Sequence, residues 1–401
     1  HLDCWCSPQS YEPDARDFGG PGNARGIVGV VRRAGKLWLD EMDHPTSNGS
    51  CPWDADFSST LAEDIAMHRR NVLQSVTRGG GQWWYDFGPT ARTPKFERYG
   101  NVGWWDTPEI LPEIEAIHRI VQDRMATPFA RPADILLVHD PMSFCHTVSQ
   151  RHAPAEFGSL PRQAVDPITP LLVDDLLHGL YGSGLCFDEA LLDELPELDL
   201  SPYRLVLLST TPVMRREHRK AVHQRIAHEG RHVVLLGYAA WSDDEVAGPE
   251  LSSALSGIAT RLHRPAQLKH QLQLGDAIET RALEGTVEVP AYDVAETDVV
   301  GRWADGQTSA ARRTTEQATW WTFALPPTSP TFLRQLALTA GCHAINSHAE
   351  TTLIGNGLII PHTIEGGPRR LQWPGGPVIE TELLPRSTTV FDGVTGERLL
   401  G

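Results

Sequence analysis

The chain has 401 residues, 40% hydrophobic and 21% charged, which is the composition of a globular protein with two or three domains rather than of a disordered one. Its 35 basic and 51 acidic residues give a net charge of −16, which argues against nucleic acid as a main partner. It contains no run of about 18 apolar residues, so we expect no segment to span a membrane.

The start of the chain and its cysteines bear on where the protein works. It begins at His1 without a basic and apolar leader, so we expect a piece of a longer protein. The six cysteines are scattered, and Cys4-x-Cys6 has neither a zinc-knuckle nor a redox spacing. We interpret them as mostly free thiols of a reduced, cytoplasmic compartment and predict no metal. A metal site of Cys4, Cys6 and Cys51 is the weaker alternative.

The first region, residues 1–128, alternates short apolar runs with helical patterns. Residues 26–31 and 36–39 are short apolar runs, and residues 61–75 have helical periodicity before a run of three glycines. A β-type run at 82–85 precedes an amphipathic stretch at 108–125. This succession of strand and helix is typical of a parallel α/β unit.

The second region, residues 129–266, predicts a doubly wound, flavodoxin-like domain. Continuous apolar runs at 133–138, 203–208 and 232–236 indicate strands covered on both faces. Helical patterns at 165–181 and 214–229 lie between them. The region has neither a Gly-x-Gly-x-x-Gly turn nor a Walker-type loop, so we expect no nucleotide and no other cofactor.

The third region, residues 267–401, carries alternating patterns and many turn signals such as Asp305-Gly306 and Asp392-Gly393. These features predict a small β-sandwich, interrupted by one helix at 331–340. The overall prediction is an α/β fold in three parts.

The strongest candidate for chemistry is residues 35–44 (GKLWLDEMDH), where a short strand runs into three acids and a histidine. In β/α barrels the active site lies at the carboxyl ends of the strands. Alternation lets only one of Asp40 and Glu41 point inward. A carboxylate with aromatic neighbours suits nucleophilic attack on an anomeric carbon, whereas a solvated acidic loop is the alternative reading.

Two further segments could complete such a site. Residues 79–86 (GGGQWWYD) could supply a wall made of Trp83, Trp84 and Asp86, since sugar sites pair aromatic platforms with carboxylates. Core packing of the tryptophans is the alternative. Tyr11 and Arg16 could orient the carboxylate, or could belong to a structural turn.

The order of these segments resembles glycoside hydrolase family 42, the β-galactosidases, and its relatives with two catalytic glutamates on a (β/α)8 barrel. Residues 7–11 (SPQSY), 35–43 (GKLWLDEMD) and 81–86 (GQWWYD) resemble the late barrel strands. Residues 135–141, 199–206, 229–234 and 256–258 resemble the trimerisation domain, and 300–306, 341–343 and 391–397 the C-terminal β-domain.

The resemblance implies a catalytic role for Glu41 as the nucleophile, with Trp84 as the floor under the sugar. It also implies substrate contacts from Trp83, Asp86, Tyr11, Arg16, Asp43 and His44, and a homotrimer formed through the second domain. The parts then run over residues 1–128 (the C-terminal part of the barrel), 129–266 and 267–401.

The sequence also departs from the family pattern. A complete barrel needs about 250 residues, and the Asn-Glu pair that carries the acid/base does not occur anywhere in the chain. The four-cysteine zinc cluster of some members is not matched either. We therefore expect a β-galactosidase-like retaining hydrolase of terminal β-linked sugars that is inactive as this chain alone. The alternative is a non-catalytic carbohydrate-binding or assembly protein.

Overall fold

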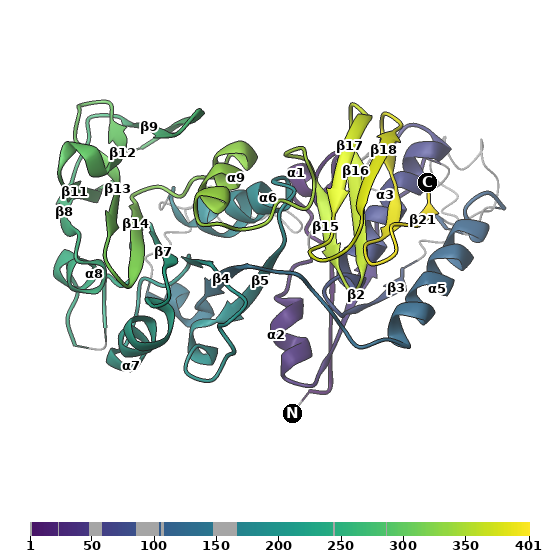
Figure 1. The fold of residues 1–401 in the computed structure, drawn as a ribbon, viewed down its shortest axis with the longest axis horizontal. Coiled ribbons are helices and arrows are strands. Elements are labelled where there is room, and N and C mark those ends of the chain that lie inside the picture. The colour runs from purple at the N-terminus through teal and green to yellow at the C-terminus, as the bar shows by residue number, and fades with distance from the viewer. Residues whose placement is uncertain are drawn as a thin grey trace, which may run out of the picture. The chain divides into compact units, whose positions relative to one another are not determined.

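The computed structural model describes residues 2–22, 24–47, 58–85, 104–105, 108–146, 167–243, 245–285 and 287–401. These residues form two compact units. The first comprises His1–Pro132, Tyr181–Cys186 and His343–Gly401, and the second comprises Ala133–Leu180 and Phe187–Cys342. The fold is mixed α/β, with one large mixed sheet and several small ones (Figure 1).

A parallel sheet of three strands lies in the first unit, in the order β1 (Cys4–Pro8), β2 (Leu37–Met42) and β3 (Gly81–Trp84). Two short helices, α1 (Pro13–Arg16) and α2 (Val28–Arg33), connect β1 to β2. The longer helix α3 (Leu61–Val76) connects β2 to β3, and α5 (Leu111–Met125) follows β3. The helices predicted at 61–75 and 108–125 are thus confirmed, with small shifts at their ends.

The apolar run at residues 26–31 contributes to a helix. Helix α2 begins at Val28, which packs with Ala24 and Trp38 in a small core. A short apolar run cannot by periodicity alone be told from a buried helical turn. The tertiary contact favours the helix here, because Trp38 on β2 offers an apolar surface to one side of α2.

The last strands of the chain complete the first unit. They form a sheet in the order β15-β16-β20-β21, with β19 also paired to β16, and a separate hairpin of β17 and β18. The β15–β16 turn uses Asn356 and Gly357, both at positive φ, as a two-residue hairpin turn requires. The bounds are β15 (Thr352–Gly355), β16 (Leu358–Thr363), β17 (Gly367–Gln372), β18 (Val378–Leu383), β19 (Ser387–Thr388), β20 (Val390–Asp392) and β21 (Arg398–Leu400).

The second unit is built on a nine-stranded sheet in the order β10-β9-β12-β13-β14-β7-β6-β4-β5. The strands from β14 to β5 are parallel, and those from β10 to β14 are antiparallel. The bounds are β4 (Ile135–His139), β5 (Phe187–Leu191), β6 (Leu205–Leu208), β7 (Arg231–Leu236), β9 (Leu268–Leu274), β10 (Ala277–Leu283), β12 (Val299–Trp303), β13 (Thr308–Thr314) and β14 (Ala318–Phe323).

The strands predicted at 133–138, 203–208 and 232–236 are β4, β6 and β7, and their apolar side chains are almost fully buried. The nine-stranded sheet continues across residue 266, since β14 pairs with β7 in parallel. The domain boundaries expected at residues 128 and 266 stay predictions. The remaining pair is β8 (Ala259–His263) with β11 (Val289–Asp293).

The helices of this unit are short, and two of them change type along their length. The stretch predicted at 214–229 is α7 (Arg216–Ala221), which passes directly into the π-helical turn η4 (Val222–Ile226). Similarly, α6 (Leu176–Tyr181) follows the π-helical turn η2 (Leu171–Asp175). The other α-helices among the described residues of this unit are α8 (Pro249–Ser256) and α9 (Pro330–Thr339), and α9 confirms the helix predicted at 331–340.

Candidate functional site

The candidate site lies at the carboxyl ends of the three parallel strands. Glu41 on the middle strand β2 is in register with Pro8 of β1 and with Trp83 of β3. Because paired residues of parallel strands point to the same side of a sheet, Glu41 and Trp83 share one face. The structure therefore brings the predicted nucleophile next to one of the two predicted tryptophans.

Alternation along β2 separates the two neighbouring acids, as the sequence predicts. Asp40 is fully buried with Trp38 and Met42 on the face that packs against α2 and α3. Glu41 is half-buried on the other face, where Leu37 is 46% exposed. Glu41 is therefore the acid of this pair that faces solvent.

Glu41 has an environment that opposes its ionisation. Partial burial and the negative charge of Asp43 raise the pKa of Glu41 above its ordinary value. A nucleophile must be ionised to attack, so any group that neutralises Asp43 also helps Glu41 to stay charged.

Asp43 is bound by two side chains that follow β1, one of them a cation. Arg16 Nη2 donates to Asp43 Oδ1 at 2.5 Å, and Tyr11 Oη donates to Asp43 Oδ2 at 2.5 Å. The guanidinium of Arg16 also lies over the Tyr11 ring at 4.3 Å. Burial and then Asp43 raise the pKa of Tyr11 to about 12, so its hydroxyl keeps the proton that it donates. Tyr11, Arg16 and Asp43 are thus brought together beside Glu41.

His44 does not reach the open face. Its side chain is buried, and burial together with the charges of Arg16 and Arg70 holds the pKa of His44 well below its usual range. The imidazole is therefore neutral at physiological pH.

The two tryptophans of β3 point in opposite directions. Trp83 lies on the Glu41 face, where its Nε1 donates to Cys6 Sγ at 2.7 Å. Trp84 lies on the helix side, where its Nε1 donates to His68 Nε2 at 2.9 Å. Trp84 is thus held behind the sheet and is not brought together with Glu41. Asp86 lies outside the described residues.

Sequence reasoning missed one residue on the Glu41 face. Tyr85 continues the pairing of β3 by donating its backbone N–H to the Met42 carbonyl oxygen, and its ring meets that of Trp83 edge-on at 6.0 Å. It is 41% exposed, so it is accessible beside Trp83. Its position directly after two tryptophans, in the β-type run 82–85, could have predicted that it joins them.

The other tryptophan pair, Trp104 and Trp105, is buried. The carbonyl of Trp104 accepts a hydrogen bond from Thr46, and the ring of Trp105 packs on His68. Both tryptophans therefore pack in the interior.

Nothing in the described part of the chain gathers three or more His, Cys, Asp or Glu side chains in a metal-binding arrangement. Cys4 and Cys6 are free and exposed on β1, and Cys51 falls outside the described residues. Within those same residues no helix is long and apolar enough to cross a membrane.

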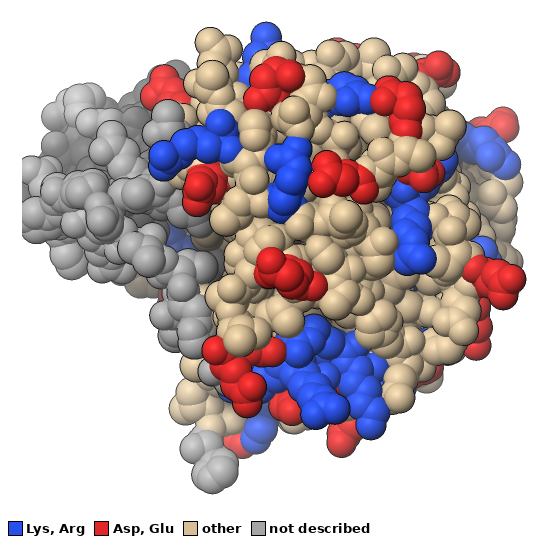
Figure 2. All heavy atoms as spheres, turned by 90° about the vertical axis from the view of Figure 1, so that its left-hand side faces the viewer, with Lys and Arg blue, Asp and Glu red and all other residues tan. Residues whose placement is uncertain are grey.

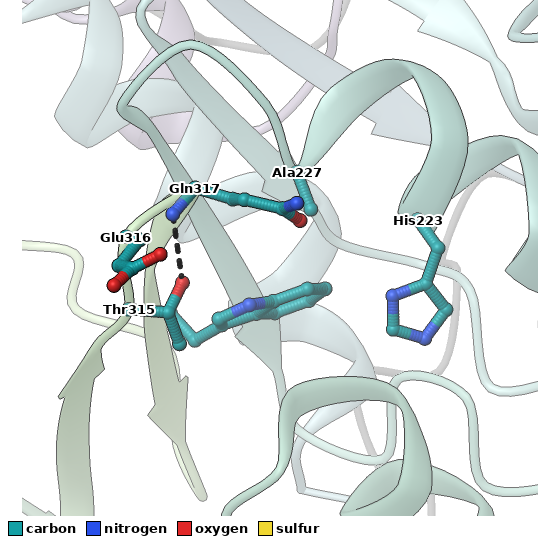
Figure 3. Close-up of a pocket in the computed structure, with 6 residues that line it drawn as sticks. His223, Ala227, Thr315, Glu316 and Gln317 are labelled. Carbon is teal, nitrogen blue, oxygen red and sulfur yellow. Dashed lines mark hydrogen bonds between the residues drawn. The ribbon is translucent and has the colours of Figure 1, made fainter.

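A hollow in the second unit is a competing candidate for a ligand site. It encloses about 370 Å³ between η4 and the turn before β14, and Figure 3 shows His223, Thr315 and Gln317 around it. Its aromatic residue, Trp320, is only 4% exposed, so it offers no open ring on which a sugar could stack. The residues around Glu41 are therefore the stronger candidate for a sugar site.

The charge of the second unit is mixed on the face that Figure 2 shows, where β8, β11 and β12 lie. Lys and Arg side chains alternate with Asp and Glu over most of it, and one group of basic side chains gathers at its lower edge.

Several solved structures with a similar fold are β-galactosidases. The β-galactosidase of Rahnella sp. R3 matches with a TM-score of 0.66 and 14% identity, over 96% of this chain and 59% of that protein. The enzyme of Halorubrum lacusprofundi matches with a TM-score of 0.60 and 14% identity, over 98% and 60%. That of Bacillus circulans sp. alkalophilus gives a TM-score of 0.57 and 15% identity, over 87% and 55%.

These matches confirm the predicted resemblance as a resemblance of fold. A β-galactosidase of G. stearothermophilus that also matches is a member of glycoside hydrolase family 42. The chain spans between 55% and 60% of the length of the three β-galactosidases above. No protein-family model matches the sequence, and no curated protein matches it either.

Proposed function

We propose that this chain is the nucleophile-bearing part of a retaining, β-galactosidase-like glycoside hydrolase that cleaves terminal β-linked sugars. The observation that carries the proposal is the place of Glu41. It projects from the carboxyl end of the middle parallel strand, on the side away from the helices, next to the indole of Trp83. In a β/α barrel this is the position of catalytic side chains.

In this reading β1, β2 and β3 are late strands of a (β/α)8 barrel. Residues 129–266 are a flavodoxin-like trimerisation domain, residues 267–401 are a C-terminal β-sandwich domain, and the protein is cytoplasmic. The likeness of fold to β-galactosidases, over 96% and 98% of this chain, supports the assignment of its parts to that architecture.

The chemistry requires two carboxyl groups about 5–5.5 Å apart. A Glu41 carboxylate oxygen bonds to the anomeric carbon while the leaving oxygen departs with a proton from the second carboxyl group. Water then gives its proton to that second group and its oxygen to the anomeric carbon, which releases Glu41. We propose that the second group is not in this chain, so that the chain alone hydrolyses nothing.

Substrate contacts are proposed for the Glu41 face of the strand ends. Trp83 supplies an apolar wall for the sugar, with Tyr85 beside it. Tyr11, Arg16 and Asp43 hold the polar rim, and Asp86 follows the same strand. Trp84 and His44 act from the buried side by supporting their neighbours.

The test compares Glu41→Gln with Asp40→Asn in the protein at its full natural length, on a panel of aryl β-glycosides that includes the galactoside. Removing the nucleophile should lower kcat/KM by several orders of magnitude, with partial rescue by azide. Asp40→Asn is the matched control, because the neighbouring acid faces the core. Full activity of the Glu41 variant, or an equal loss in both, would overturn the assignment.

The second candidate is a non-catalytic carbohydrate-binding or assembly protein. One observation favours it, namely that neither acid beside Glu41 is free to act as the second carboxyl group of the reaction. Asp43 is bound to Arg16 and Tyr11, and Asp40 faces the helices. If the parent protein binds sugars in calorimetry but turns over no glycoside on the panel, this candidate takes precedence.

A further inference from the structure

The loop between α1 and α2 is fixed by side chains from the end of the chain. Gly19 donates its N–H to His362 Nε2 at 2.9 Å, and its carbonyl oxygen accepts from Thr351 Oγ1 at 2.9 Å. Gly19 has φ +94°, and a Cβ there would lie 2.5 Å from Ile364 Cδ1. Both peptide groups of this glycine are therefore bound to the C-terminal strands in a conformation that other residues do not adopt readily.

The protonation state of His362 follows from its partners. Because Nε2 accepts from Gly19, the proton is on Nδ1, which lies 2.7 Å from Thr388 Oγ1. Thr388 in turn donates to the Ala66 carbonyl of α3. Burial, with the charges of Arg70 and Arg386, holds the pKa of His362 well below its usual range. The ring thus stays neutral and joins the loop to α3.

Helix α3 holds the other side of the same loop through Arg70. This buried side chain donates from Nη1 to the carbonyls of Asp17 and Gly20, at 2.7 and 3.0 Å, and from Nη2 to that of Arg16 at 3.1 Å. The backbone of Arg16 therefore depends on the same loop that His362 fixes. Its side chain forms the ion pair with Asp43.

We infer that His362 is a positioning residue of the candidate site: by fixing the loop at Gly19, it keeps Arg16 paired with Asp43 beside Glu41. The C-terminal strands then take part in the site without touching it. The catalytic importance of His362 rests on the proposed role of Glu41. The contacts of His362, Gly19 and Arg16 do not depend on that role.

The charge on Asp43 sets the direction in which the titration of Glu41 should move. The charged group that acts on Glu41 is Asp43, which is faced by Arg16 and Tyr11 from the segment after β1. If the loop relaxes and Arg16 withdraws, Asp43 keeps an uncompensated negative charge. Proton loss from Glu41 then becomes harder, so its titration moves to higher pH.

The experiment follows the Glu41 carboxyl carbon by NMR in this chain, labelled with ¹³C-glutamate and assigned by the signal lost in Glu41→Gln. We expect the midpoint to move to higher pH in His362→Ala and in Thr351→Val. His362→Gln should restore the parent midpoint, because its amide oxygen can accept from Gly19. His270→Ala is the matched control, since this buried histidine packs on Trp303 in the second unit.

Circular dichroism establishes that each variant is folded. Should His362→Ala fail to fold, the nearly isosteric Thr351→Val decides the question, because it removes only the bond to the Gly19 carbonyl. An unchanged Glu41 midpoint in the folded variants overturns the inference. A shifted midpoint in a protein that cleaves no glycoside would instead sustain it and remove the proposed function.

Discussion

Two consecutive acids on β2 show how much a single position matters at the residue scale. Glu41 faces solvent beside Trp83, whereas Asp40 lies in the core and accepts a hydrogen bond from Trp38 Nε1 at 2.5 Å. Burial raises the pKa of Asp40 to about 6, although Trp38, Gln9, Arg78 and Ser75 favour its ionised form. The same strand therefore carries one acid suited to chemistry and one whose buried charge destabilises the fold.

Asp40 should make the protein less stable as the pH rises. The folded pKa of about 6 exceeds the unfolded value of 3.8, so the folded state holds the extra proton between these limits. Stability should therefore fall from about pH 4 to pH 6, by up to about 3 kcal/mol from this residue. Asp40→Asn should be more stable than the parent at pH 7 and equal to it near pH 4, as measured by thermal unfolding. An equal stability of the two at both pH values would contradict this.

At the scale of elements, the start of α3 is fixed by local and distant bonds together. Thr60 caps the helix by accepting from the Glu63 N–H, and Glu63 accepts from the Ser59 N–H at 2.8 Å. Glu63 also accepts from Arg386 Nε at 2.5 Å. The first turn of α3 is thus joined to the segment between β18 and β19, close to the strands that hold Gly19.

Glu63 should stabilise the protein only above acidic pH. Arg386 and the Ser59 hydrogen bonds lower the pKa of Glu63 from 4.5 to about 2. Its contribution is therefore present above about pH 4.5 and is lost as the pH falls toward 2. Since Arg386 is 46% exposed, solvent screening leaves about 1–2 kcal/mol. Glu63→Gln should cost this amount at pH 7 and progressively less toward pH 3, in denaturant titrations. As a control, Glu397→Gln at an exposed position should leave the stability unchanged both at pH 7 and at pH 3.

At the scale of the whole molecule, the open face of the parallel sheet is an apolar surface. Leu37 is 46% exposed there, and Cys4 and Cys6 of β1 are exposed on the same side. β1 is also an edge strand among the described strands of this sheet. Exposed apolar faces and edges promote association, so this surface should make the chain prone to aggregate.

The assembly can be measured by light scattering. We expect a species of three times the chain mass of 44.3 kDa, from the proposed trimer, together with larger aggregates. Leu37→Lys should remove the aggregates and keep the trimer, because the proposed trimer contact lies in the other unit. A mass equal to one chain would contradict the trimer, and unchanged aggregation in the variant would contradict the role of the open face.

The sequence alone determined what depends on near neighbours. The period of two along β2 separated Asp40 from Glu41, and the period of 3.6 located α3 and α5. The buried strands β4, β6 and β7 followed from their continuous apolar runs. The order of short motifs was enough to predict the fold resemblance that the solved β-galactosidases confirm.

Only the tertiary structure decided what depends on distant partners. The register of β3 against β2 placed Trp83, and not Trp84, beside Glu41. The pairing of β14 with β7 carried the large sheet past residue 266. Gly19 and His362 meet across 343 positions of the chain, through a partly buried hydrogen bond that no local sequence pattern predicts. Local periodicity reflects which side of an element is apolar, whereas pairing and buried polar contacts depend on which elements the fold brings together.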